Sequence, residues 1–230
     1  MTFSQYGIQA RIMPAILCSV PFLIFYYWYL SPALSGMFSF FADVKLVSNI
    51  SFPIVLIFLF SMINRHLSKV IFQKFYFGDE LYMPTTNFLM YSDSQYTNEY
   101  KNAFRNKIFA DFGIRLLEAR EESENEISAR KRIIESMSLI RKRGDKSKML
   151  LQHNIEYGFF RNLIGGSVIA APFSLILALY GFIFTDNTIA VTSLFLCFVI
   201  FFLFILFSKN LINEHGIAYA KILFQEYMSS

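Results

Sequence analysis

Charge-free apolar stretches are the dominant pattern along this chain. Four windows contain no Asp, Glu, Lys or Arg, and they are Ile12–Ala42, Leu46–Asn64, Asn162–Thr185 and Asn187–Ser208. Each window reaches the length of about 20 residues that a helix needs to cross a hydrocarbon core of about 30 Å. The pattern predicts four transmembrane helices, over about residues 12–32, 46–64, 164–185 and 187–208.

A soluble core and a signal peptide both fit the apolar windows less well than membrane spans do. Four helices buried in a soluble core would need more polar chain around them than 230 residues supply. The first window follows Arg11 and contains Ser31-Pro-Ala33, which resembles the cleavage site of a signal peptide. The apolar part is longer than the stretch of about 7–15 residues found in signal peptides, so we expect a retained helix.

The composition supports a membrane protein, and the distribution of charge along the chain predicts its orientation in the membrane. Hydrophobic residues make up 55% of the chain and charged residues 17%, below the roughly 25% usual in soluble domains. Of the 21 Lys and Arg residues, 17 lie between Arg65 and Arg161. Since positive charge collects in cytoplasmic segments, we expect this central region and both termini to lie in the cytoplasm.

The predicted fold is an all-α membrane protein. Four transmembrane helices form two hairpins, and a mostly helical cytoplasmic domain is inserted between them. We assign residues 1–66 to the first hairpin, 67–161 to the domain, 162–208 to the second hairpin and 209–230 to a cytoplasmic tail helix.

One helix of the inserted domain is well defined by its pattern. Aromatic and aliphatic residues recur every four positions from Tyr96 to Phe112. Thr97 is placed as an N-cap and Gly113 as a C-terminal stop. The tyrosines on this face are expected to be core residues of the domain.

A second helix is expected over Ile127–Arg143, ending at Gly144, with Asp145 capping the next helix. The glutamates of Glu118–Glu126 indicate a solvated linker or the acidic start of this second helix. Its buried side is expected to carry Ile127, Ile134, Met137 and Ile140.

Polar residues directly precede the third window. A helix through Leu151, Ile155 and Phe159 is expected to run into the third span. We interpret its polar residues as a joint between domain and membrane, and they are His153, Glu156, Tyr157 and Arg161. A membrane-embedded active site at the same residues is an alternative interpretation.

Small residues recur every four positions along the third window, at Gly166, Ala170, Ser174 and Ala178. Such a strip lets another helix backbone approach closely in lipid. It predicts a helix-packing or oligomerisation surface, whose neighbour is either the fourth span or another subunit.

Two basic triplets stand eleven residues apart in the inserted domain. They are candidate contacts for an anionic partner and comprise Arg130, Lys131, Arg132, Arg141, Lys142 and Arg143. Nucleic acid or nucleotide phosphates would suit them, and so would anionic lipid. The central region holds 17 basic and 13 acidic residues, a net charge of only +4, which favours the lipid or simple retention charge over direct nucleic-acid binding.

Motifs for catalysis or metal binding are not found in the sequence. There is no phosphate-binding glycine loop, zinc-ligand spacing, nucleophile elbow or dinucleotide fingerprint. The histidines His66, His153 and His215 lack the paired spacing of metal ligands. We therefore expect a protein that is not an enzyme and that needs no metal and no cofactor.

Two sequence elements of the central region resemble those of small bacterial membrane proteins of about this size. One is Pro-Thr-Thr-x-Phe-Leu-x-x-Ser-Asp, here from Pro84 to Asp93, and the other is Asn-x-x-Tyr-Gly-Phe-x-Arg-Asn-Leu, here from Asn154 to Leu163. Such proteins look like the membrane effectors of bacterial anti-phage systems, including those paired with retrons. The resemblance covers about residues 77–166, implies a bacterial inner-membrane location and supplies no catalytic residue.

The functional expectation is an effector that oligomerises to permeabilise or depolarise the inner membrane when triggered through its cytoplasmic domain. Its expected partners are the lipid bilayer, further copies of itself, and a cytosolic protein or nucleoprotein. The alternative is a non-catalytic membrane anchor or adaptor that recruits a cytosolic complex.

Overall fold

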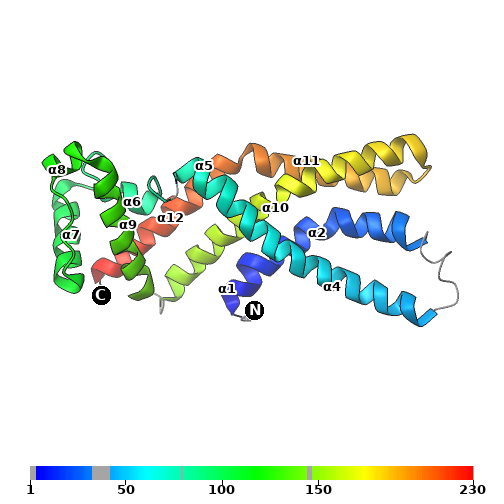
Figure 1. Cartoon of the computed structure of the whole chain (residues 1–230), viewed down its shortest axis with the longest axis horizontal. Helices are drawn as coiled ribbons and strands as arrows, with labels where there is room; N and C mark the ends of the chain where they lie inside the picture. The colour runs from blue at the N-terminus through cyan, green and yellow to red at the C-terminus, as the bar shows by residue number, and fades with distance from the viewer. Residues whose placement is uncertain (1–3, 33–41, 79, 144–146, 230) are drawn as a thin grey trace. The chain divides into compact units, whose positions relative to one another are not determined.

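The structure is a computed structural model that describes residues 4–32, 42–78, 80–143 and 147–229. Helix is the only regular secondary structure within these ranges (Figure 1), so the predicted all-helical fold is confirmed for the described residues. The helical segments, with π-helical ones marked η, are α1 Gln5–Gly7, η1 Ile8–Ile12, α2 Met13–Phe25, η2 Tyr26–Leu30, α4 Ala42–Leu67, η3 Ser68–Gln73, α5 Lys74–Phe77, α6 Pro84–Asn87, α7 Asn98–Phe112, α8 Ala119–Glu124, α9 Glu126–Arg143, α10 Lys148–Phe184, α11 Thr188–Leu206 and α12 Ser208–Ser229.

Four continuous helices among the described residues are long and apolar enough to cross a membrane, which confirms the predicted number of candidate spans. They are Gln5–Leu30, Ile50–Phe77, Lys148–Phe184 and Thr188–Leu206. The second and third extend well beyond the apolar windows. The second continues through the basic segment after Arg65, and the third, as the sequence predicted, includes Ile155 before the third window.

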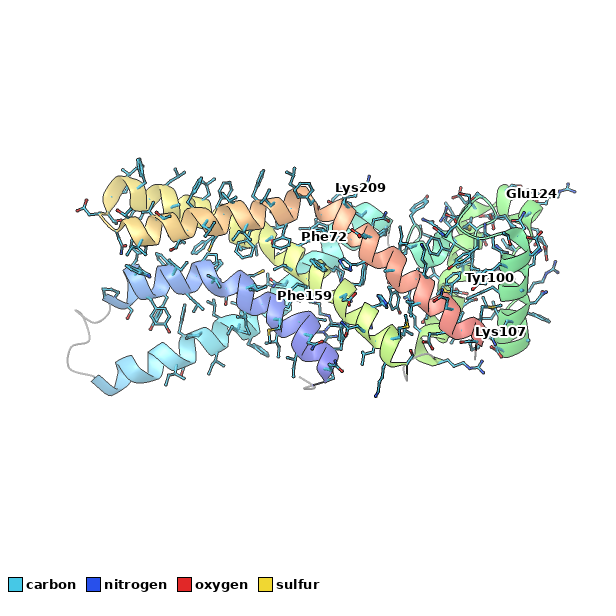
Figure 2. The ribbon with its side chains drawn as sticks, turned by 180° about the vertical axis from the view of Figure 1, so that it is seen from behind. Phe72, Tyr100, Lys107, Glu124, Phe159 and Lys209 are labelled. Atoms are coloured by element: carbon cyan, nitrogen blue, oxygen red, sulfur yellow. The ribbon has the colours of Figure 1, made fainter. Side chains whose placement is uncertain are left out.

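The chain divides into two compact units. Unit 1 comprises Met1–Lys69 and Gly158–Lys209, and unit 2 comprises Val70–Tyr157 and Asn210–Ser230. Side chains of both are drawn in Figure 2, where Phe159 and Lys209 belong to unit 1 and Phe72, Tyr100, Lys107 and Glu124 belong to unit 2. The helices α10 and α12 each carry residues of both units.

Unit 1 is packed through aromatic and small residues of its candidate spans. The ring of Phe22 on α2 stacks on that of Phe173 on α10, with centroids 3.8 Å apart. The main cluster of buried residues is Ala15, Cys18, Phe60, Leu163, Ala170, Ala171 and Phe201. Large apolar side chains also remain exposed, among them Val55 at 63% and Phe182 at 78%. Exposed apolar faces on backbone-satisfied helices are what a lipid environment requires.

Unit 2 has its own core around α7, α9 and α12. The first helix of the domain is confirmed with both ends, because the Thr97 side chain accepts a hydrogen bond from the Tyr100 amide and Gly113 ends the helix at φ +67°. Phe104 and Ile108 have no exposed surface. The other core residues include Ile133, Met137, Ile140, Leu223, Phe224 and Tyr227.

Two details of unit 2 differ from the sequence expectation. The segment rich in glutamate forms a separate short helix, α8, with a reciprocal capping box between Glu118 and Glu121. Glu122 on this helix is buried. On α9, Ile127 is 57% exposed, and Ala129 and Ile133 supply the buried face in its place. The predicted stop at Gly144 and cap at Asp145 lie outside the described residues.

Candidate functional site

The small-residue strip of α10 is buried inside unit 1. A Cβ added to Gly166 would overlap the Cys18 thiol of α2 and would lie 2.5 Å from the Asn64 side-chain oxygen of α4. At the other end of the strip, Ala178 shares a buried cluster with Leu194 of α11. The remaining members, which are also fully buried, are Ala170 and Ser174. The strip therefore contacts three other helices of the same chain, two of which the sequence had not suggested as neighbours.

Asn162 bonds to two other helices from a buried position on α10. Its Nδ2 donates to the Ala10 carbonyl at 2.6 Å, and its Oδ1 accepts from the Ser68 hydroxyl at 3.2 Å. Ala10 lies in η1 and Ser68 is the first residue of η3. π-helical segments interrupt the regular backbone ladder and are frequent at functional sites. We call Asn64, Ser68 and Asn162 the polar seam.

Asn64 is the member of the polar seam that has no oxygen or nitrogen partner among the described residues. It has no exposed surface, and neither amide atom bonds to an oxygen or nitrogen among the described residues. The Cys18 thiol lies beside it as a weak hydrogen-bonding partner. Leaving a buried amide unsatisfied costs about 1–3 kcal/mol. A rearrangement that let water reach Asn64 would recover that cost.

Among the described residues of unit 1, the polar residues that are buried as a whole carry neutral side chains. Besides the polar seam, the buried side chains of this kind in unit 1 include Ser19, Ser61, Ser167 and Ser174. Neutral hydroxyl and amide groups can line a hydrated passage without the large cost of a charge in lipid. This chemistry suits passage of water or ions better than proton-coupled transport.

The four residues predicted as a joint all lie on α10, but they do not converge on one point. His153 Nδ1 lies 3.6 Å from Glu156 Oε2, and Gln152 also donates to Glu156 at 2.9 Å. Tyr157 is buried, and its ring lies nearly parallel to that of Tyr219, with centroids 6.5 Å apart. Arg161 belongs to unit 1, whereas the other three belong to unit 2.

The basic triplets divide into internal and exposed residues. Arg130 is buried, donates to the Asn87 side chain at 2.7 Å and the Leu81 carbonyl at 2.9 Å, and pairs with Glu126 at 2.7 Å. Its guanidinium also lies over the ring of Tyr82. Arg130 therefore fastens the Pro84–Asp93 element to α9.

The second triplet is engaged in a similar way. Arg141 donates to the Thr85 hydroxyl at 3.2 Å and lies 3.7 Å from Glu80, while Arg143 pairs with Asp111 at 2.7 Å. Arg132 donates to a backbone carbonyl, and the triplet residues that remain exposed are Lys131, Arg132, Lys142 and Arg143. Contacts within the protein therefore engage four of the six cations, which are Arg130, Arg132, Arg141 and Arg143.

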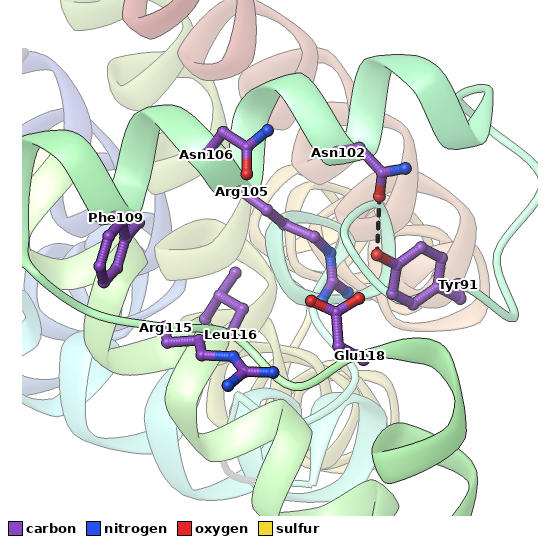
Figure 3. Close-up of a pocket in the computed structure, with 8 residues that line it drawn as sticks. All are labelled: Tyr91, Asn102, Arg105, Asn106, Phe109, Arg115, Leu116 and Glu118. Carbon is purple, nitrogen blue, oxygen red and sulfur yellow. Dashed lines mark hydrogen bonds between the residues drawn. The ribbon is translucent and has the colours of Figure 1, made fainter.

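A cavity of about 430 Å³ lies beside α7 in unit 2 (Figure 3). Residues of α7, the following extended segment and the Pro84–Asp93 element line it. The lining includes Tyr91, Asn102, Arg105, Asn106, Phe109 and Arg115. None of these residues stood out in the sequence as a site.

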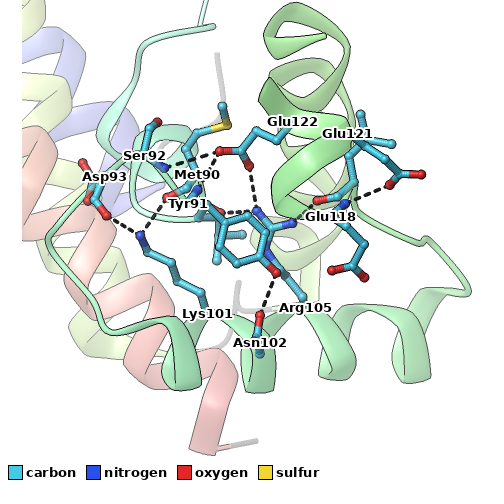
Figure 4. A network of polar contacts seen from close by, with 12 residues as sticks. Met90, Tyr91, Ser92, Asp93, Lys101, Asn102, Arg105, Glu118, Glu121 and Glu122 are labelled. Carbon is cyan, nitrogen blue, oxygen red and sulfur yellow. Dashed lines mark hydrogen bonds and ion pairs between the residues drawn. The ribbon is translucent and has the colours of Figure 1, made fainter. Parts of the chain in front are cut away.

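A buried ionic network adjoins this cavity through Tyr91 and Arg105, which belong to both (Figure 4). Arg105 bonds to the Leu89 carbonyl and pairs with Glu122 at 3.1 Å. Glu122 in turn accepts the Tyr91 amide at 2.7 Å. Lys101 donates to the carbonyls of Met90 and Asp93 from a site with no exposed surface. These bonds hold the Pro84–Asp93 element against α7 and α8.

Burial sets the electrostatics of this network. Desolvation lowers the pKa of Lys101, partly offset by the charge of Asp93. Desolvation also raises the pKa of Tyr91, against the effect of the nearby Arg105 charge. The described residues contain no group of three potential metal ligands among His, Cys, Asp and Glu. The contacts of this network join the Pro84–Asp93 element to α7 and α8, and none of them places a nucleophile beside a base.

No protein-family model, curated protein or solved structure matches this chain.

Proposed function

We propose that this protein is a multi-pass effector of the bacterial inner membrane that permeabilises or depolarises it, in defence against phage, when its cytoplasmic part is triggered. In this proposal the spans form two hairpins, unit 2 is cytoplasmic with both termini, and several copies assemble. The membrane-effector resemblance of the Pro84–Asp93 and Asn154–Leu163 elements supports the biological setting.

The observation that carries the proposal is the polar seam. Asn64, Ser68 and Asn162 are buried among candidate spans that otherwise pack through apolar and small side chains. An unsatisfied amide at Asn64 favours a second arrangement in which water enters between the helices. The unsatisfied Asn64 amide raises the free energy of the closed bundle, and this favours opening when the protein is triggered.

Coupling from unit 2 has a physical route in the helices. α10 and α12 are continuous segments that carry residues of both units. In this proposal, a shift of α10 within unit 2 reaches the span residues that the same helix contributes to unit 1. Helix shifts of this kind are a common form of switching.

Replacement of the spans distinguishes an effector from an adaptor. A chimera keeps unit 2 and carries unrelated transmembrane helices in place of the candidate spans, with membrane insertion checked by immunoblot of membrane fractions. We expect the chimera to lose protection against phage because unrelated helices lack the polar seam. Full protection by the chimera would refute permeabilisation and favour an adaptor.

A further inference from the structure

The cavity beside α7 carries polar groups that the folding of unit 2 leaves free. Asn102 and Asn106 lie on one face of α7 because they are four residues apart. Asn102 accepts the Tyr91 hydroxyl at 2.7 Å, whereas the Asn106 carboxamide has no hydrogen-bond partner among the described residues. A carboxamide presents a donor and an acceptor side by side, which matches the edge of a nucleobase.

An aromatic ring stands at the rim of the same cavity. Phe109 follows Asn106 by three residues on α7 and is 58% exposed. Figure 3 shows Phe109 and Asn106 on α7, with Arg115 and Leu116 on the segment that faces them. Exposed rings beside polar groups are the usual stacking platforms for bases.

Positive charge lies on the segment opposite α7. The guanidinium of Arg115 has no ion-pair partner among the described residues, and Arg132 reaches the backbone of Arg115 at 3.1 Å. Arg105 contributes less, because its charge is balanced by Glu122. The opposing carboxylate in the lining is Glu118, which is engaged as the N-cap of α8. Guanidinium groups are strong ligands for phosphate.

We propose that this cavity binds a nucleoside phosphate, with the base against Phe109 and Asn106 and the phosphate on Arg115. The volume of about 430 Å³ lies within the range of small-molecule sites. This binding is independent of membrane permeabilisation, since either an effector or an adaptor can carry a ligand site in unit 2.

The test measures binding to the full-length protein in detergent by equilibrium dialysis. The probes are AMP, GMP, CMP and UMP, their parent nucleosides, and inorganic phosphate. We expect at least one monophosphate to bind, and its nucleoside to bind about tenfold more weakly because the contact with Arg115 is lost. Phe109→Ala and Arg115→Ala should each weaken monophosphate binding by about tenfold.

Arg120→Ala is the matched control. Its side chain is 91% exposed on α8 and pairs with Glu124, outside the lining of the cavity. Binding should be unchanged in this variant. The inference is overturned if no monophosphate binds at about 1 mM, if phosphate alone binds as tightly as the nucleotide, or if either cavity variant binds as the wild type does.

Discussion

Lys101 and Arg105 are cations that behave as core residues. They occupy the same face of α7 as Phe104 and Ile108, and Lys101 has no exposed surface. Burial of a charge is tolerated because backbone carbonyls and Glu122 surround the two groups. The apolar periodicity of α7 predicted the buried face correctly, but it did not indicate that both cations lie on that face.

Asn64 and Asn162 allow a matched test at the residue scale. Asn64→Leu removes an unsatisfied amide, so we expect stabilisation by about 1–3 kcal/mol if the leucine is accommodated. Asn162→Leu removes two made hydrogen bonds and should destabilise by a similar amount. Thermal unfolding of the full chain in detergent measures both. Equal destabilisation by the two substitutions would show that Asn64 is satisfied.

The contact between Asp111 of α7 and Tyr227 of α12 should make the stability of unit 2 depend on pH in the acidic range. Hydrogen bonds from Arg143 and then Tyr227 hold the pKa of Asp111 below its usual value of 3.8, and the charge of Lys107 acts in the same direction. A folded-state pKa below the unfolded value contributes stability above pH 3.8, and this contribution is lost as the pH falls further.

The check compares wild type with Asp111→Asn by circular dichroism. The wild type should have the higher melting temperature at about pH 6, and the difference should shrink towards about pH 3. A difference that does not change with pH would exclude the Asp111 carboxylate as its source.

At the scale of elements, close helix approach is tested by two glycines. A Cβ on Gly165 would lie 2.7 Å from the Asn64 carbonyl oxygen, whereas a Cβ on Gly216 would make ordinary contacts at 3.5 Å or more. Gly165→Ala should therefore lower the melting temperature. Gly216→Ala should raise stability by about 1 kcal/mol, the usual helix-propensity gain. Stabilisation by both variants would contradict the close packing of α4 and α10.

Elements with a strong local signal could be predicted from the sequence. α7 was located to the residue because its cap, its period of four and its terminal glycine agree. α8 was missed because a run of glutamates has the same pattern in a solvated linker and in a short capped helix. The role of Glu122 depends on Arg105, seventeen residues earlier, and no local pattern indicates that pair.

The packing of α12 was also outside the reach of local patterns. The sequence indicated a helical tail after the fourth span, whereas Leu223, Phe224 and Tyr227 are part of the core of unit 2. Apolar periodicity shows that a face will be buried, but it does not identify the helices that bury it.

At the scale of the whole molecule, the candidate site was only partly foreseeable. The small-residue strip was evident from spacing, but the polar seam joins Asn162 to Ala10 across 152 residues. Similarly, the six basic residues looked alike until the structure joined Arg130 to Asn87, Arg141 to Glu80 and Arg143 to Asp111. Long-range partners decide which polar residues remain free for function.

Membrane potential during infection tests the central proposal most directly. Bacteria that express the chain with its native neighbouring genes would be challenged with a panel of phages, while a potential-sensitive dye is read in single cells. We predict that protection against a phage is accompanied by loss of potential, and that Asn64→Leu weakens both. Protection with a normal membrane potential would contradict the account.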